Sequence, residues 1–302
     1  MKQKLLERVY GSSLLPVVAI ENSEDAVELG KTFLNAGVCL IEITFRTEAA
    51  AEAIEKLAGS GLDITVGAGT VLTTEMAEKA VRAGAEFLVT PGFDEEVIKW
   101  AVEREVPIFP GVTSPGDITK AMRFGLDVVK FFPSESIGGI KMLKSLSGPF
   151  KNMRFIPTGG ISQKNIGDYM NLGNVLACGG SWICPTGMIS GHEYDKIYQL
   201  TAEAESLIHG FSLQRVDIRT EEENDTAPDF AANMIGTLKT AGKGSRGRIT
   251  VGVRNVERAA AYLKICGCSV DEGSVVKEGG ETEEICLNEE IGGFAVYLRK
   301  QF

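Results

Sequence analysis

Lys130 has the most unusual surroundings of the charged residues in this sequence. It lies in an apolar segment, residues 126–132, that is typical of a buried β-strand. An ammonium group is seldom placed in such a strand without a function, and burial favours the neutral amine, which can attack a carbonyl group. We therefore expect Lys130 to be a nucleophile. The alternative is a lysine that pairs with a nearby carboxylate for structural reasons alone.

Two further side chains that could take part in chemistry lie at the end of another apolar segment. Because side chains alternate along a strand, Glu42 and Arg46 share one face, and Lys130 shares a face with Phe132. If both faces point into one cavity, they bring together a nucleophile, a carboxylate that moves protons and a guanidinium that holds a substrate carboxylate. The alternative is a surface ion pair between Glu42 and Arg46.

Paired glycines follow two later strand-like segments. Residues 157–160 read Pro-Thr-Gly-Gly, and residues 179–181 read Gly-Gly-Ser. Glycines at strand ends are more often only turn residues. However, backbone N–H groups of such loops can hold a phosphate group, and two consecutive strand ends with Gly-Gly favour a phosphorylated substrate.

The elements that must position these residues alternate along the chain. Stretches with helical periodicity and charged faces, such as residues 23–36, 48–59, 73–84 and 94–104, separate eight apolar segments. This order predicts an α/β fold, a (β/α)8 TIM barrel, with the active site at the carboxyl ends of the strands. A doubly wound open sheet is the alternative, but no G-x-G-x-x-G follows the first strand. The predicted strands are residues 14–20, 37–43, 62–67, 86–90, 106–109, 126–132, 153–157 and 174–178.

The composition argues against several classes of partner. The formal net charge of the 302 residues is −10, and basic residues are scattered singly, so we expect no nucleic-acid partner. The chain shows neither an apolar stretch of membrane-spanning length nor the apolar core of a secretory signal, so we expect a cytoplasmic protein with no membrane partner. Two histidines cannot build a multi-histidine metal site, and the six cysteines suit reduced thiols, so we expect neither a metal nor disulfides.

Six short segments at the predicted strand ends carry specific motifs: E-I-T-F-R-T at 42–47, G-A-G-T-V-L at 67–72, T-P-G at 90–92, K-F-F-P at 130–133, P-T-G-G-I at 157–161 and G-G-S-W at 179–182. Together they resemble the motifs of one aldolase family. This family includes 2-keto-3-deoxy-6-phosphogluconate (KDPG) aldolase and 4-hydroxy-2-oxoglutarate (KHG) aldolase, and the resemblance covers about residues 1–210. The chain departs from the family pattern at Phe45, where leucine is common, and at Thr90, where serine is common.

The resemblance implies a metal-independent lyase without a cofactor, in which Lys130 forms a Schiff base with a 2-keto acid and Glu42 shuttles protons. KDPG would yield pyruvate and glyceraldehyde 3-phosphate, and KHG would yield pyruvate and glyoxylate. The family also implies trimers formed through the barrel. The implied substrate-binding residues are Arg46 and Thr70 at the pyruvate carboxylate, Pro91 and Phe132 beside the substrate, and Thr158, Gly159, Gly160, Gly180 and Ser181 at the phosphate.

Two other functions fit the same barrel. It could carry a sugar-phosphate isomerase or synthase in which Lys130 is an electrostatic clamp and forms no adduct. It could also be a noncatalytic sensor that binds a phospho-sugar. For an aldolase, the preferred aldehyde stays open, because activities on KDPG, its galactonate analogue and KHG would share one nucleophile and one carboxylate clamp.

The sequence pattern changes after residue 210. We predict a barrel domain at residues 1–212, a linker or partly ordered connection at 213–245 and a small α+β module at 246–302. The module has a βαβββ order, with a helix capped by Asn255, and resembles one half of a glyoxalase-like, vicinal-oxygen-chelate domain. Members of that superfamily usually bind a metal, but this segment has no histidine. Because half of a paired fold leaves a sheet face or edge uncovered, we expect the module to mediate self-association, which could enlarge a trimer.

Overall fold

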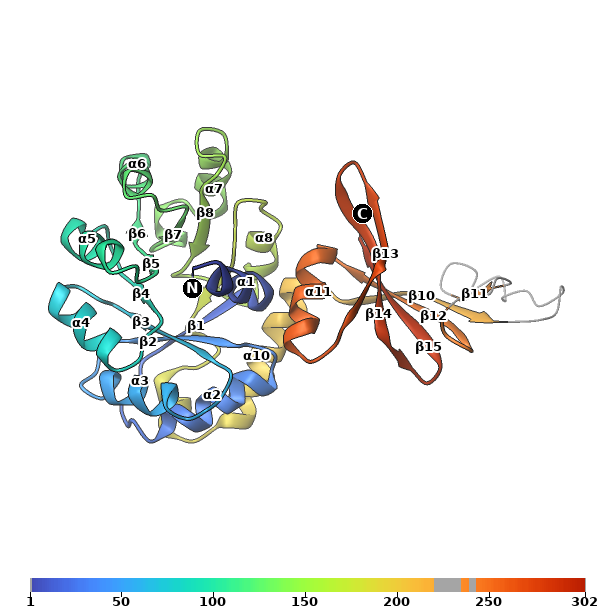
Figure 1. Ribbon diagram of the computed structural model, residues 1–302, viewed down its shortest axis with the longest axis horizontal. Helices are drawn as coiled ribbons and strands as arrows, with labels where there is room; N and C mark the ends of the chain where they lie inside the picture. Colours follow the sequence, from blue (N-terminus) through green and yellow to red (C-terminus); the bar gives the residue numbers. More distant parts are fainter. Residues whose placement is uncertain (1, 220–234, 239–242, 302) are drawn as a thin grey trace. The chain divides into compact units, whose positions relative to one another are not determined.

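The computed structural model describes residues 2–219, 235–238 and 243–301, with the backbone alone for residues 235–238. The chain divides into two compact units, residues 1–205 and residues 206–302. Figure 1 shows both units.

Unit 1 is an α/β structure built on a curled parallel sheet, as the sequence predicts. One set of paired strands has the order β5-β4-β3-β2-β1-β9, and a second has the order β6-β7-β8. A parallel bridge between Thr158 and Gly179 joins the end of β8 to β9, and Pro110 alone separates β5 from β6. The strands are β1 (Leu14–Val18), β2 (Leu40–Thr44), β3 (Thr65–Gly69), β4 (Phe87–Val89), β5 (Ile108–Phe109), β6 (Gly111–Val112), β7 (Val128–Phe131), β8 (Arg154–Pro157) and β9 (Cys178–Gly180).

Helices surround these strands in Figure 1. Local sequence explains where several of them begin, because Thr73, Asp94 and Ser114 each accept a hydrogen bond from a backbone N–H of the first turn. The four helices predicted by periodicity are found within two residues of their expected ends, as α2 to α5. The helices are α1 (Lys2–Ser12), α2 (Asp25–Asn35), α3 (Ala50–Ala58), α4 (Thr74–Arg82), α5 (Glu95–Glu103), α6 (Pro115–Arg123), α7 (Gly139–Ser147), α8 (Ile166–Met170), α9 (Thr186–Ser190) and α10 (Tyr194–His209), with a short 3₁₀ helix at Glu135–Ile137.

Helix α1 lies against the amino ends of the strands. Its Leu5 and Val9 are buried, and Lys2 pairs with Asp127, just before β7, at 2.7 Å. Arg8 pairs at 2.7 Å with Asp63, just before β3. The opposite end of the sheet, where the strands finish, therefore carries the loops that are free to form a site.

The described residues of unit 2 form a mixed sheet with the strand order β11-β10-β12-β15-β14-β13. Helix α11 packs on it, and apolar residues of α11, β12, β13, β14 and β15 form the core between helix and sheet. Asn255 accepts a hydrogen bond from Arg258 N at 2.8 Å, which confirms the predicted cap. The elements are β10 (Ser212–Arg219), β11 (Ile235–Leu238), β12 (Gly247–Val253), α11 (Val256–Ile265), β13 (Val270–Glu278), β14 (Glu281–Ile291) and β15 (Phe294–Lys300).

The segment predicted as a linker, residues 213–245, contains two strands, so this part of the prediction is wrong. Strand β10 pairs antiparallel with β12, and β11 pairs parallel with β10. The sequence misled because β10 is rich in polar residues: Arg215 Nε and Asp217 Oδ1 lie 2.6 Å apart and neutralise each other on the sheet. Residues 220–234 and 239–242 of the predicted linker lie outside the described residues.

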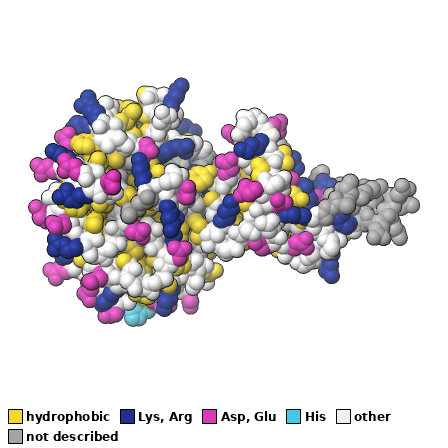
Figure 2. Space-filling model, viewed as in Figure 1, with side chains coloured by type: hydrophobic (Ala, Val, Ile, Leu, Met, Phe, Trp, Pro, Cys, Tyr) yellow, Lys and Arg dark blue, Asp and Glu magenta, His cyan; other side chains and the backbone are white. Residues whose placement is uncertain are grey.

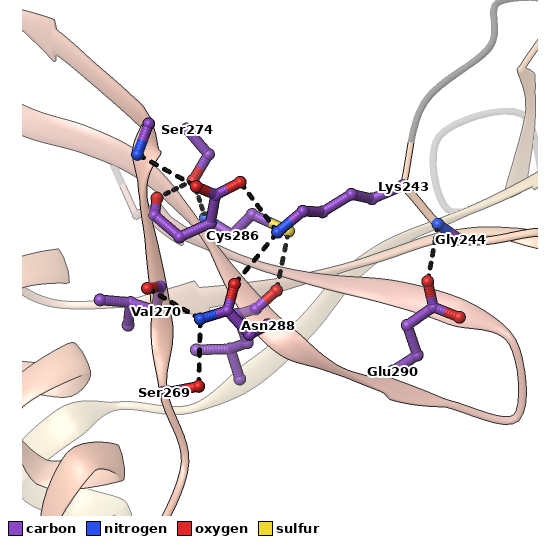
Figure 3. A network of polar contacts seen from close by, with 11 residues as sticks. Lys243, Gly244, Ser269, Val270, Ser274, Cys286, Asn288 and Glu290 are labelled. Carbon is purple, nitrogen blue, oxygen red and sulfur yellow. Dashed lines mark hydrogen bonds and ion pairs between the residues drawn. The ribbon is translucent and has the colours of Figure 1, made fainter.

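A polar network ties the ends of β13 and β14 to the segment before β12 (Figure 3). Lys243 Nζ lies 2.8 Å from Asp271 Oδ2 and 3.2 Å from Asn288 Oδ1. The Asn288 amide donates in turn to Ser269 Oγ and to Val270 O, each at 3.0 Å. These contacts link neighbouring strands through side chains, so they support the structure of unit 2.

Charged side chains of both signs are mixed over the face of the molecule shown in Figure 2. None of the described helices combines the length and the apolar character needed to cross a membrane.

Candidate active site

The side chains of Lys130 and Glu42 meet inside unit 1. Lys130 on β7 is 4% exposed and Glu42 on β2 is 0% exposed. The Lys130 Nζ atom donates to Glu42 Oε1 at 3.1 Å. Strands β2 and β7 are not paired with each other, so the two side chains meet across the interior that the curled sheet encloses. The other oxygen, Glu42 Oε2, is buried and has no hydrogen-bond partner among the described residues, which leaves it available to a substrate or a water molecule.

A glycine on the neighbouring strand makes room for the carboxylate. Gly69 of β3 lies opposite Thr44 of β2 in the parallel pairing. A Cβ atom at Gly69 would lie 2.1 Å from Glu42 Oε1, closer than any real contact. The G-A-G-T segment therefore serves the site by lacking a side chain at this position.

Arg46 and Thr70 lie at the rim of the same end of the sheet. Arg46 Nε donates to Thr70 Oγ1 at 3.4 Å. Thr70 has a φ of 56°, a left-handed conformation that is rare for a threonine and often marks a functional position. The predicted pair of substrate-carboxylate ligands is thus brought together, and Arg46 keeps an exposed side chain.

Phe132 and Pro91 lie near the lysine. Lys130 Nζ is 5.3 Å from the centre of the Phe132 ring. Lys130 is in register with Gly111 of β6, and a Cβ atom at Gly111 would lie 2.3 Å from the Pro91 carbonyl oxygen. Thr90 fixes this contact, because its hydroxyl donates to Gly92 O at 2.6 Å and accepts from Gly111 N at 3.2 Å. The T-P-G segment is therefore held close to β6, the strand that pairs with the Lys130 strand β7.

The glycine loops after β8 and at the end of β9 lie side by side. Thr158 and Gly179 form a parallel bridge, and a Cβ atom at Gly179 would lie 2.1 Å from Thr158 Oγ1. Gly159 and Gly160 have φ angles of 91° and 80°. Gly180 contacts the Trp182 ring, and Ser181 is exposed. All five residues predicted for the phosphate are thus in these two adjacent loops.

The arrangement combines a buried amine, a carboxylate within hydrogen-bond distance of it and two adjacent glycine-rich loops. Such a set can form and resolve an imine with proton transfer inside a water-poor interior. Among the described residues, no group of three or more His, Cys, Asp or Glu side chains is arranged to hold a metal ion. Sequence reasoning missed Asn165 and Tyr169, which lie beside the glycine loop, because residues 165–170 match no recognisable motif.

Comparison with known proteins agrees with this geometry. The aldolase family described as KDPG and KHG aldolase matches residues 6–200. The 2-dehydro-3-deoxy-phosphogluconate aldolase of Haemophilus influenzae is 41% identical over 206 residues, which are 68% of this chain and 97% of that protein. The KHG/KDPG aldolase of Escherichia coli K12 is 40% identical over 191 residues, 63% of this chain and 90% of that protein.

Solved structures give the same result. The KDPG aldolase of Zymomonas mobilis is 36% identical, with a TM-score of 0.63, and the match covers 68% of this chain and 96% of that one. The KDPG aldolase of Legionella pneumophila, solved with pyruvate captured as a covalent carbinolamine, is 38% identical with a TM-score of 0.63 over 65% of this chain and 96% of that one. The family match ends before unit 2 begins. By its first 200 residues, the chain belongs to the family of KDPG and KHG aldolases.

Proposed function

We propose that this protein is a Schiff-base-forming aldolase that cleaves KDPG to pyruvate and glyceraldehyde 3-phosphate. The same site would also cleave KHG to pyruvate and glyoxylate. The observation that carries the proposal is the buried contact of 3.1 Å between Lys130 Nζ and Glu42 Oε1. It unites a nucleophile with a proton carrier, and relatives at about 40% identity carry the names of these aldolases.

The reaction begins when the neutral Lys130 amine attacks the C2 carbonyl of the 2-keto acid. Glu42 supplies the proton with which the carbinolamine loses water, and an iminium forms. The C4 hydroxyl then gives up its proton to Glu42, directly or through water. The electrons of the C3–C4 bond move to the iminium, so the aldehyde leaves and an enamine remains. Protonation of the enamine at C3 and hydrolysis release pyruvate and free lysine, and the imine nitrogen serves as electron sink without a metal.

The remaining site residues bind the two ends of the substrate. Arg46 and Thr70 hold the pyruvate carboxylate, and Phe132 and Pro91 pack against the carbon chain. The glycine loops bind the phosphate through backbone N–H groups, in which Thr158, Gly159, Gly160, Gly180 and Ser181 take part.

We also propose the finer features expected from the sequence. A closed eight-stranded barrel is supported by the bridge from Thr158 to Gly179 and by the continuity of β5 with β6 through Pro110. A glyoxalase-like βαβββ module at residues 246–302 is supported by the order β12, α11, β13, β14, β15. A cytoplasmic location is supported by six free cysteines.

We propose a homo-oligomer as well, a trimer through unit 1 that unit 2 could enlarge. Light scattering on the full chain and on a chain without residues 213–302 tests this. Equal assembly states would remove the role of unit 2 in association.

Cleavage of KDPG, followed through the pyruvate released, tests the proposed activity. The Lys130→Met variant should lose cleavage, because no amine remains to form the imine. Lys141→Met, which changes an exposed lysine of α7, should cleave at the rate of the unaltered protein. Retained cleavage in Lys130→Met would refute the mechanism.

A further inference from the structure

The loop proposed for the phosphate is clamped through its carbonyl groups. Three successive carbonyl oxygens each accept a hydrogen bond from the neighbouring segments: Thr158 O from Ser134 N at 2.8 Å, Gly159 O from Glu135 N at 3.1 Å and Gly160 O from the Asn165 side-chain amide at 3.0 Å. The Gly160 N–H donates to none of the residues that the structure describes. With its carbonyls occupied and two successive left-handed glycines, the loop offers its N–H side to an anion.

Asn165 acts on both sides of this turn. Its side-chain oxygen accepts from Ser162 N at 2.8 Å, while its side-chain nitrogen donates to Gly160 O. One amide therefore fixes the orientation of the Gly160 peptide and of the residues that follow it.

The side chain of Glu135 lies over Gly160. A Cβ atom at Gly160 would lie 2.5 Å from Glu135 Cγ, so the two are in direct contact. The hydroxyl of Tyr169 donates to Glu135 Oε1 and lies 2.9 Å from Ser134 Oγ. Tyr169 is fully buried. Burial, and then the Glu135 carboxylate, raises the pKa of this hydroxyl, so it keeps its proton and remains a donor.

The Glu135 carboxylate is an internal competitor for the phosphate. It is a negative group in contact with the loop that should receive another negative group, and a free carboxylate could turn toward the Gly160 N–H. The hydrogen bond from the Tyr169 hydroxyl occupies Glu135 Oε1 and ties the carboxylate to α8. Loss of that bond would make the segment that holds residues 158–160 less rigid. It would also free the Glu135 carboxylate to move toward the Gly160 N–H.

We propose that Tyr169, which holds Glu135, and Asn165, which fixes the Gly160 peptide, are positioning residues that keep the Gly160 N–H open to a phosphate and so set the preference for phosphorylated over unphosphorylated substrates. The inference rests on the proposed function. Their side chains bond to Ser134, Glu135, Gly160 and Ser162, so we expect both to act on phosphate binding and to leave formation of the Lys130 imine unchanged.

The Tyr169→Phe variant tests this, because it removes one oxygen atom and keeps the buried ring. KM for KDPG should rise about fivefold or more, with kcat within about twofold of the unaltered value, because a single hydrogen bond is lost. The pyruvate concentration that half-saturates borohydride trapping on Lys130 should not change, because pyruvate carries no phosphate. Tyr194→Phe is the matched control, since the Tyr194 hydroxyl also donates to a carboxylate, Asp25 Oδ1, at 3.2 Å.

A second variant separates the effect of the Glu135 charge from the effect of a more mobile loop. Adding Glu135→Gln to Tyr169→Phe removes the competing charge and should recover part of the KM increase. An unchanged KM for KDPG in Tyr169→Phe would overturn the inference. So would an equal rise in KM and in the pyruvate concentration that half-saturates trapping. Neither result would affect the proposed aldolase activity. If the unaltered protein neither traps pyruvate nor cleaves KDPG, the proposed function itself is wrong.

Discussion

Lys130 and Glu42 are separated by 88 positions in the chain, yet Lys130 Nζ and Glu42 Oε1 lie 3.1 Å apart in the interior of unit 1. Both side chains are almost completely buried. Burying two charged groups costs more than their attraction returns unless geometry is favourable, so this pair is better explained by chemistry than by stability.

Replacing Glu42 by glutamine should reduce cleavage of KDPG by about a hundredfold or more, because the amide keeps the shape but cannot carry a proton. Steady-state rates measure this, with circular dichroism to confirm the fold. Glu55→Gln, at an exposed position on α3, is the control. Activity within about twofold of the unaltered protein would show that another group carries the proton.

Replacing Gly69 by alanine should lower kcat/KM, because the added methyl group would displace Glu42. The new Cβ atom would lie 2.1 Å from Glu42 Oε1, so the carboxylate must leave Lys130. We expect kcat/KM to fall at least about tenfold, since a displaced proton carrier loses much of its effect. Gly148→Ala, where no atom lies within 4 Å of the added Cβ, should be silent. A normal kcat/KM in Gly69→Ala would mean that the position of Glu42 does not limit the reaction.

The stability of unit 2 should fall in acid because of His209. This ring packs on Tyr262 and Phe211, with ring centres 4.5 and 5.3 Å apart. Burial, followed by the charge of Arg258, lowers the pKa of His209 to about 3. Below its ordinary value of 6.5 the unfolded chain binds a proton that the folded unit rejects. Stability should therefore fall by about 1.4 kcal/mol per pH unit from about pH 6 to pH 4, and should not change from this cause above pH 7.

Hydrogen exchange of the β12 and β15 amides, measured at several pH values and converted to a free energy of unfolding at each, measures this dependence. His209→Phe should flatten the slope, because the phenyl ring keeps the aromatic contacts and binds no proton. His192→Asn is the control in unit 1. An equal slope in His209→Phe would assign the acid sensitivity of unit 2 to other groups.

The six cysteines should react with an alkylating reagent in an order set by burial. Cys266 is exposed, whereas Cys184 is fully buried and its burial raises its pKa to about 12. Because the thiolate is the reactive form, Cys266 should be labelled first and Cys184 only after unfolding. Mass mapping after brief labelling at pH 8 checks this. Early labelling of Cys184 would show that the interior beside β1 opens readily.

The sequence predicts the alternating elements of unit 1 well, because amphipathic periodicity is a direct consequence of having one buried face. It places some strand limits poorly. In the apolar segment 37–43, Val38 and Cys39 are buried, but the strand starts only at Leu40. Burial alone therefore does not separate a strand from the residues that lead into it. Helix α1 was not predicted, since charged residues interrupt its apolar face.

In the site, the sequence identifies residues with reactive groups and misses those that only position them. Lys130, Glu42 and Arg46 carry unusual charges at strand ends, which the pattern reveals. The sequence includes Gly69 in the G-A-G-T-V-L segment but does not show that it leaves space for Glu42. It also does not show that Tyr169 donates to Glu135, 34 positions away. Such contacts depend on which segments become neighbours, and a single sequence does not show this.

The central claim is a covalent bond between Lys130 and a 2-keto acid. Incubation of the full chain with pyruvate and borohydride, followed by peptide mapping, tests it most directly. The account predicts one reduced pyruvate adduct, on Lys130, and none in Lys130→Met. A protein that stays unmodified, or that carries the adduct on another lysine, would contradict it.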